Sequence, residues 1–254
     1  MLYNIKEKMQ TEEFVNIEYA KYLSSISLTE FKELYTSKDK DLKSTHSLLV
    51  KTCKQVLTVN PYKRNFSFSR GKDYGRRFSE NGGLQGLPKI IRGALCKDCT
   101  TDIDMRNAHP QILLKILTEN EYSCPNLKEY CNNRDFVFKQ LFQDDGFSKE
   151  DSKNALLRSM NKGTRCVSKT DPKINQFFKN FDKEMKDIQN FLWSLEKYNF
   201  IKNDVDTTKG NTRGSFLNLI LCKCENEILE LTINYLIDMG YENIYYSPKD
   251  EKFA

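Results

Sequence analysis

The interpretation of the fold depends on one stretch, Asp102-Ile103-Asp104-Met105-Arg106-Asn107-Ala108-His109-Pro110-Gln111-Ile112-Leu113. Its first part alternates polar and apolar residues, which predicts a strand over 100–105 with Asp102 and Asp104 on the same face. Paired carboxylates at the end of a strand are hard oxygen ligands suited to Mg²⁺. Two exposed aspartates that are merely solvated are the alternative interpretation.

The sequence on both sides of this stretch predicts a helix-rich α+β fold with a small antiparallel sheet. Asn107 is placed to cap a helix that has Pro110 in its first turn, and Ser148 with Asp151 resembles a capping box. Helices are expected over 1–60, 88–95, 107–118, 148–163, 174–195 and 215–239, and strands within 62–86 and over 100–105, 199–206 and 242–247. We expect a helical N-terminal region over 1–60 and one continuous unit over 61–254.

Length and composition bound the class of protein. The 254 residues, 39% of them hydrophobic, are enough to bury a core, which argues against disorder as the main state. The longest apolar run, 216–222, is interrupted by Asn218 and is far shorter than the roughly 20 residues of a membrane span. The N-terminus lacks a secretory signal, so we expect an intracellular protein with eight reduced cysteines. The pairs Cys96/Cys99 and Cys222/Cys224 would bind zinc only if they met in space.

Positive charge is concentrated in residues 61–92, where eight basic and two acidic side chains give a net charge of +6. The basic residues, which are interleaved with five aromatic rings, are Lys63, Arg64, Arg70, Lys72, Arg76, Arg77, Lys89 and Arg92. Cations release counterions from a phosphate backbone and rings stack on bases, so this window predicts nucleic-acid binding. A solvated lysine-rich surface is the alternative.

A second cationic surface is expected on the helix over 148–163. Lys153, Arg158 and Lys162 follow one another at intervals of five and four residues, which gives the helix a partly cationic face. Such a face can bind a triphosphate, whose negative charge must be neutralised during phosphoryl transfer.

Taken together and in order, these motifs resemble the palm and fingers of family A DNA polymerases over residues of about 70–230. The matching segments are Gly75-Arg76-Arg77-Phe78-Ser79, Leu84-Gln85-Gly86-Leu87-Pro88 with Arg92, the stretch 102–113, Arg158-Ser159-Met160-Asn161-Lys162-Gly163, and Arg213-Gly214-Ser215-Phe216-Leu217-Asn218 leading to Glu225-Asn226. The phrase Asp-Ile-Asp-Met-x-Asn-Ala-His-Pro is most similar to the divergent polymerases of large DNA viruses, phages and mobile elements.

The resemblance implies template-directed DNA synthesis in DNA replication, with Mg²⁺, dNTP and a DNA primer–template. It implies that Asp104, with Asp102 as a lesser candidate, and Asp250 are the catalytic and metal-binding carboxylates. Nucleotide contacts would come from Arg158, Lys153, Lys162, His109 and Arg92, and nucleic-acid contacts from Arg70, Arg76, Arg77, Gln85, Arg213 and Asn218. Residues 1–60 would be a reduced thumb or an accessory region, and 61–254 the palm and fingers, truncated at the C-terminus.

The chain departs from the family in several places. His109 stands where the family has a Glu at the sugar edge, and Lys162 where an aromatic residue packs on the deoxyribose, so both bear on sugar selection. The segment Lys249-Asp250-Glu251 occupies the place of the His-Asp-Glu motif C, whose carboxylate two-metal catalysis requires. A charged tail is the alternative interpretation of this segment.

Two functional hypotheses follow from these observations. The first is a nucleotidyltransferase that extends a primer, and the second is a catalytically inactive or split polymerase fragment that binds nucleic acid. A second chain carrying motif C, or a helicase or primase, would be a partner, and no membrane partner is expected. A viral origin would place the protein in the host cytoplasm or in the virion.

Overall fold

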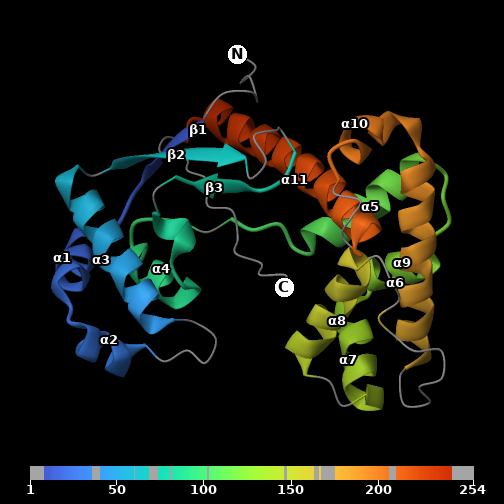
Figure 1. Cartoon of the computed structure of the whole chain (residues 1–254), viewed down its shortest axis with the longest axis horizontal. Coiled ribbons are helices and arrows are strands. Elements are labelled where there is room, and N and C mark those ends of the chain that lie inside the picture. Colours follow the sequence, from blue (N-terminus) through green and yellow to red (C-terminus); the bar gives the residue numbers. More distant parts are fainter. Residues whose placement is uncertain are drawn as a thin grey trace. The chain divides into compact units, whose positions relative to one another are not determined.

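The computed structural model describes residues 9–35, 41–59, 61–68, 74–80, 82–101, 103–145, 148–162, 166, 175–205 and 210–241 (Figure 1). The chain divides into two compact units. Unit 1 comprises the residues up to Asp104 and, from Glu230 onward, the end of the last described helix, and unit 2 comprises Met105–Leu229. None of the described helices is both long and apolar enough to cross a membrane.

Unit 1 combines an antiparallel sheet with helices that Figure 1 shows on one side of it. The sheet has the order β1-β2-β3, with β1 (Met9–Glu13), β2 (Tyr62–Phe68) and β3 (Arg77–Ser79). The helices are α1 (Ile17–Ser25), α2 (Leu28–Leu34), α3 (Leu42–Thr58), the 3₁₀ turn η1 (Leu84–Gly86) and α4 (Lys89–Leu95). Leu49, Cys53 and Val56 of α3 pack with Leu87 and Leu95 in the core of the unit.

The structure confirms a helix-rich chain with a small antiparallel sheet, and it corrects the expectation for residues 1–60. Residues 9–13 are a strand, with Met9 opposite Phe66 and Glu13 opposite Tyr62. This pairing joins segments that lie about fifty residues apart in the chain, so local periodicity does not reveal it. The same pairing puts residues on both sides of the expected boundary at residue 60 into one unit.

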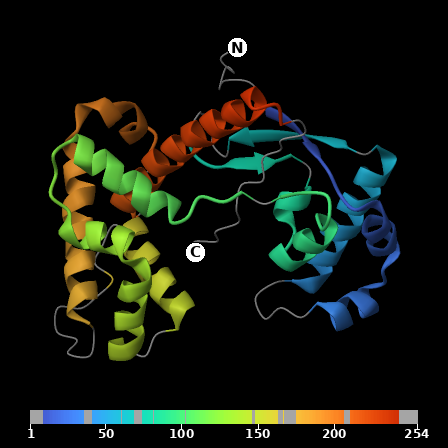
Figure 2. The ribbon, with the colours of Figure 1, turned by 180° about the vertical axis from the view of Figure 1, so that it is seen from behind.

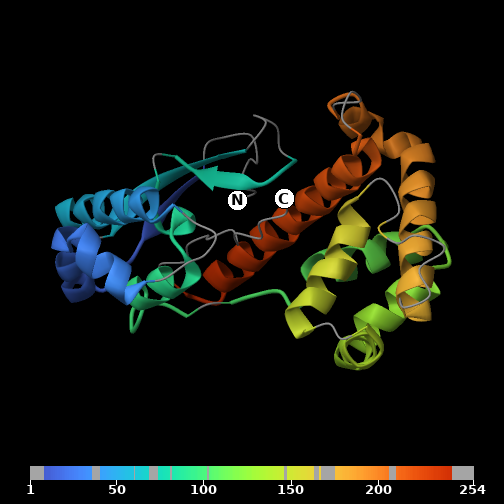
Figure 3. The same cartoon turned by 60° about the horizontal axis from the view of Figure 1, so that its bottom comes forward.

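Unit 2 is built from helices in its described part. These are α5 (Ala108–Glu119), α6 (Pro125–Asn132), α7 (Arg134–Asp145), α8 (Lys149–Asn161), α9 (Gln176–Ser194), η2 (Glu196–Tyr198), α10 (Asn199–Lys202) and the first part of α11 (Thr212–Asp238). Helix α9 lies against α6 and α8 (Figure 2), and its buried face, with Phe178, Phe181 and Met185, forms the core. Figure 3 shows α11 as one unbroken helix.

Four helix predictions in unit 2 are confirmed and one strand prediction is wrong. Ser148 and Asp151 form the expected capping box of α8, and α5, α9 and α11 are helices over nearly the predicted ranges. Residues 199–205 are helix and turn instead of strand, because Ile201 and Val205, four residues apart, are both buried as on one helical face. The predicted strand over 242–247 lies outside the described residues.

Candidate functional site

The turn before α5 determines where His109 lies. Asn107 occupies the N-cap position with a left-handed backbone (φ 59°), a conformation that asparagine tolerates. The prediction that its side chain caps the helix is wrong. Instead, Asn107 Oδ1 accepts a hydrogen bond from the Tyr130 hydroxyl at 3.0 Å. This contact ties the start of α5 to α6.

His109 is buried and contacts α11 within unit 2. Its Nε2 donates to Glu225 Oε2 at 3.2 Å, and Cys222 also hydrogen-bonds the ring. Burial by itself lowers the pKa of His109, but hydrogen bonds with Cys222 and Glu225, together with their charges, outweigh it and raise the pKa to about 9. The His109 ring therefore faces α11, where Glu225 accepts its hydrogen bond.

Asn218, Cys222 and Glu225 lie on one face of α11, at intervals of four and three residues. The Cys222 thiol donates to Asn218 Oδ1 over 3.9 Å, a distance acceptable for sulfur. Cys222 thus belongs to a polar cluster with His109 and Glu225. The spacing in the sequence places Asn218, Cys222 and Glu225 on one helical face, but the contact of this face with His109 depends on α5 meeting α11.

The end of α8 carries the predicted phosphate-binding cations. Arg158 and Lys162 are exposed, whereas Lys153 is half-buried. Helix α9 binds the last carbonyls of α8: Lys186 Nζ donates to the Ser159 carbonyl at 2.6 Å, and Gln189 Nε2 donates to the Met160 carbonyl at 2.6 Å. These contacts satisfy carbonyls that have no partner within the helix, so the last turn of α8 is held firmly.

The same end of α8 lies against the start of α11. Asn211 Nδ2 donates to the Asn161 carbonyl at 2.9 Å, and a Cβ at Gly214 would overlap that carbonyl oxygen. Next to this junction, the half-buried Arg213 stacks its guanidinium over the Trp193 ring at 4.0 Å, and burial lowers the pKa of Arg213. One helix, α11, therefore contacts the end of α8 with its first turn and the start of α5 further along.

The predicted strand around Asp104 is wrong for the residues that the structure describes. Thr101 and 103–105 have no strand structure, and Ile103 and Met105, which gave the alternating pattern, are exposed. Alternation forms a strand only where a neighbouring strand takes up the backbone hydrogen bonds. Asp104 is exposed, and Asp102, Asp250 and the whole segment 249–251 lie outside the described residues.

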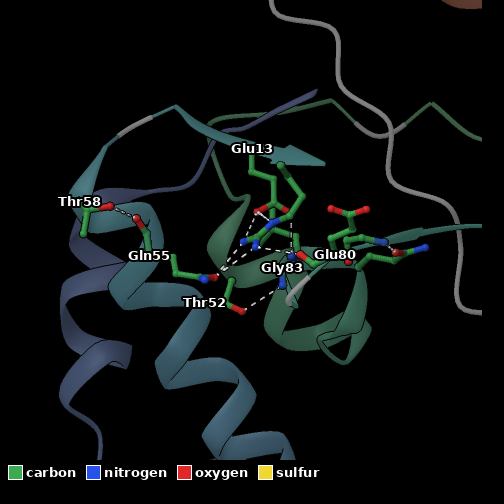
Figure 4. A network of polar contacts seen from close by, with 10 residues as sticks. Glu13, Thr52, Gln55, Thr58, Glu80 and Gly83 are labelled. Atoms are coloured by element: carbon green, nitrogen blue, oxygen red, sulfur yellow. Dashed lines mark hydrogen bonds and ion pairs between the residues drawn. The ribbon is translucent and has the colours of Figure 1, made fainter. Parts of the chain in front are cut away.

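Part of the basic window faces inward in unit 1. Arg64 is buried: its Nε and Nη2 donate to Glu13 Oε2 at 3.1 and 3.0 Å, and Gln55 Oε1 accepts from both Nη atoms at 3.2 Å (Figure 4). Arg77 is buried as well and forms an ion pair with Glu230. Two of the eight cations therefore neutralise carboxylates of the chain itself.

Arg77 and Gln85, two of the predicted nucleic-acid contacts, are both buried in unit 1. Gln85 Nε2 donates to the Arg77 carbonyl at 2.9 Å, and its Oε1 accepts from the Ser79 backbone at 2.6 Å. Both ends of the buried amide therefore hydrogen-bond to the backbone of β3. Arg76 and Arg92 are half-buried, and Arg92 Nη1 donates to the Gln85 carbonyl at 3.4 Å. Arg70 and Lys72 lie outside the described residues, while Lys63 and Lys89 are exposed.

A groove of about 680 Å³ along α3 was not predicted. Its lining includes His46, Lys51, Lys54, Gln55 and Tyr62, and the described lining contains no acidic side chain. Lys51 and Lys54 precede the cationic window 61–92 in the sequence, and the fold brings them next to Tyr62 of that window.

Comparison with known proteins gives one distant similarity. In an alignment of 178 positions that covers 67% of this chain, the sequence is 26% identical to a protein of the Sputnik virophage named "Putative helicase V13". The chain matches about a quarter of that protein's length, 23%. Neither a family model nor a solved structure matches the chain.

Proposed function

We propose that this chain contains the nucleotide-binding part of a template-directed DNA polymerase of the family A type, which adds nucleotides to a primer. One observation supports the proposal most strongly. Three segments that the resemblance assigns to one centre contact one another through α11 within unit 2: the start of α5, the end of α8 and the helix face with Asn218. Sequence order alone does not require these contacts.

In this proposal the triphosphate binds at the end of α8. Arg158 and Lys162 are exposed there, and the turn that bears them is held by α9, so little ordering is needed when an anion binds. Arginine suits this role because its guanidinium makes two parallel hydrogen bonds to phosphate oxygens. His109, which is buried against Glu225, would fix the start of α5 instead of reaching into solvent for the sugar.

In this proposal Asp104 is a ligand of Mg²⁺. A carboxylate is the hard oxygen donor that Mg²⁺ prefers, and Asp104 is exposed, so the described residue fits one ligand position. When bound, Mg²⁺ would neutralise charge on the transferring phosphate. Asp102 and Asp250, the other proposed ligands, complete the set in this proposal.

Nucleic acid binds to unit 1 in this proposal. The groove along α3 offers Lys51 and Lys54 for phosphates and the Tyr62 ring for stacking, without an opposing carboxylate in its described lining. This groove supplies the cationic surface that Arg64 and Arg77 do not, because both are buried in ion pairs.

We do not transfer helicase activity from the name of the virophage protein to this chain. A P-loop NTPase motor binds ATP through Gly-x-x-x-x-Gly-Lys-Ser/Thr, and the 254 residues contain no such motif. The similarity covers a quarter of the virophage protein and is compatible with a polymerase segment next to a helicase in one longer chain. A helicase partner, on the same chain or another, therefore belongs to the proposal.

Replacing Arg158 tests the nucleotide site. We expect Arg158→Ala to weaken dNTP·Mg²⁺ binding about 10 to 150 fold, because a charge-assisted contact is worth roughly 1.5–3 kcal/mol. Lys149→Ala is the matched control: it removes one positive charge from the exposed first turn of the same helix, where Lys149 lies 3.8 Å from Asp135. Fluorescence titration with a labelled dNTP measures both. Equal affinities for Arg158→Ala and Lys149→Ala would refute the site.

A further inference from the structure

Three side chains that commonly bind metals meet inside unit 2. His109 and Cys222 are buried, with 7% and 1% of their surface exposed, and Glu225 is half-buried. A ring nitrogen of His109, the Sγ of Cys222 and a carboxylate oxygen of Glu225 all lie within 4.8 Å of one another. The proposed function uses His109 and Glu225 only to fix α5 on α11, and it assigns nothing to Cys222.

We propose that His109, Cys222 and Glu225 bind a divalent cation of the Zn²⁺ class, with one further coordination position open to water. The cation replaces the thiol proton of Cys222, which leaves to solvent, and His109 binds as the neutral imidazole. Zn²⁺ takes nitrogen, sulfur and oxygen ligands at about 2.0–2.3 Å, so ligand atoms in a tetrahedral site lie roughly 3.3–3.8 Å apart. The His109–Glu225 pair is already at 3.2 Å, and movements of about 1 Å or less bring Cys222 into the same range.

The backbone presents the three ligands from two helices. Cys222 and Glu225 are three residues apart and share a face of α11, while His109 comes from the start of α5, which the Asn107–Tyr130 hydrogen bond holds in place. Asn218 Oδ1, 3.9 Å from Cys222 Sγ, is a neighbouring protein oxygen available for the open position. Ligands placed on helices in this way need little reorganisation to bind a metal.

The chemistry of the ligands separates this site from the one proposed at Asp104. Thiolate and imidazole favour Zn²⁺ and related transition metals, whereas Mg²⁺ requires hard oxygen ligands. A cation at His109, Cys222 and Glu225 would join α5 to α11 by coordination. The inference stands on the cluster alone and does not depend on polymerase activity.

Cobalt titration of the full chain tests the site. Co²⁺ replaces Zn²⁺ in such sites, and a thiolate ligand gives a charge-transfer band together with visible d–d bands. We expect one Co²⁺ per chain, displaced by one equivalent of Zn²⁺ and not by millimolar Mg²⁺. We expect Cys222→Ser to abolish the charge-transfer band, and Glu225→Gln to weaken binding more than about 100 fold, since even second-shell partners are worth 10–100 fold.

Cys224→Ser is the matched control. Cys224 lies on the same helix two residues away and outside the cluster, so its loss should leave the spectrum and the affinity unchanged. A charge-transfer band that survives in Cys222→Ser, or no stoichiometric binding by wild-type chain that is folded by circular dichroism, overturns the proposal. If Cys222→Ser fails to fold, the half-exposed Glu225→Gln decides: unchanged Co²⁺ affinity in that variant also overturns it. Nucleotide binding is not part of this readout, so the result is separate from the outcome for the proposed function.

Discussion

At the scale of single residues, buried charged side chains stabilise the fold of unit 1. Arg64, with 2% of its surface exposed, is surrounded by Glu13, Gln55 and the backbone of Glu80 (Figure 4). Removing one partner of such a pair costs about 3–5 kcal/mol, because the other charge stays buried and unpaired. From the sequence alone, Arg64 and the exposed Lys63 next to it are indistinguishable as cations, since only the pairing of β1 with β2 brings Glu13 to the arginine.

Gly83 tests this network. Its backbone has φ +103° and ψ −177°, a region accessible essentially only to glycine, and an added Cβ would lie 2.6 Å from Glu13 Oε1 and 2.7 Å from Arg64 Nε. We expect Gly83→Ala to lower the free energy of unfolding by about 3 kcal/mol or more, since it combines backbone strain with a displaced ion pair. Urea denaturation measures the change.

Gly93→Ala is the control for this prediction. Gly93 is exposed in α4, and nothing lies within 4 Å of its added Cβ. Alanine is the better helix former by roughly 0.5–1 kcal/mol, so we expect Gly93→Ala to be slightly stabilising. Equal losses of stability in Gly83→Ala and Gly93→Ala would contradict the claim that only glycine fits the backbone and the close contacts at position 83.

At the scale of elements, local signals predicted the helices, while contacts that are distant in sequence decided the strands. The capping box at Ser148 and the apolar spacing of α9 act within one helix, so the sequence shows them directly. Strand β1 depends on β2, and the alternation at 103–105 has no strand beside it in the described part of the chain. The cluster of Cys222 with His109 likewise depends on α5 meeting α11, which no spacing within either helix specifies.

The junction of α8 and α11 gives a prediction about helix packing. We expect Gly214→Ala to destabilise unit 2 by about 1–3 kcal/mol, because its methyl group would displace the Asn161 carbonyl in a close-packed contact. We also expect weaker dNTP binding, since the same turn of α8 carries Arg158 and Lys162. Urea denaturation and the labelled-dNTP titration measure the two effects. Gly210→Ala is the control, since nothing lies within 4 Å of its new Cβ, and it should change neither the stability nor dNTP binding. If Gly214→Ala gave the same stability and dNTP affinity as Gly210→Ala, the close packing of α8 on α11 would be contradicted.

At the scale of the whole molecule, the distribution of charge matters more than its sum. The net charge of +6 over 61–92 overstates the cationic surface, because Arg64 and Arg77 bind Glu13 and Glu230, and Glu230 lies far outside the window. The groove along α3 adds Lys51 and Lys54 to that surface from outside the window. Counting charges in a sequence window captures neither effect, since both require the fold of unit 1.

Salt dependence of DNA binding tests the groove. We expect Lys51→Ala with Lys54→Ala to flatten the slope of log K against log salt by about one unit per lost phosphate contact. Lys32→Ala with Lys43→Ala removes the same charge from exposed positions that do not line the groove, and it should leave the slope nearly unchanged. Fluorescence anisotropy over a salt series measures both double variants. Equal slopes for the two would place the DNA elsewhere on the molecule.

The central claim is that the chain binds the nucleotide that its template specifies. The most direct measurement uses a primer–template whose primer ends in a dideoxynucleotide, so that no extension is possible, and compares its dissociation constant with each of the four dNTPs and Mg²⁺. We expect the dNTP complementary to the next template base to tighten the complex at least about tenfold, or ~1.4 kcal/mol, relative to the other three. Equal dissociation constants with all four dNTPs would contradict it and leave a protein that binds nucleic acid without reading a template.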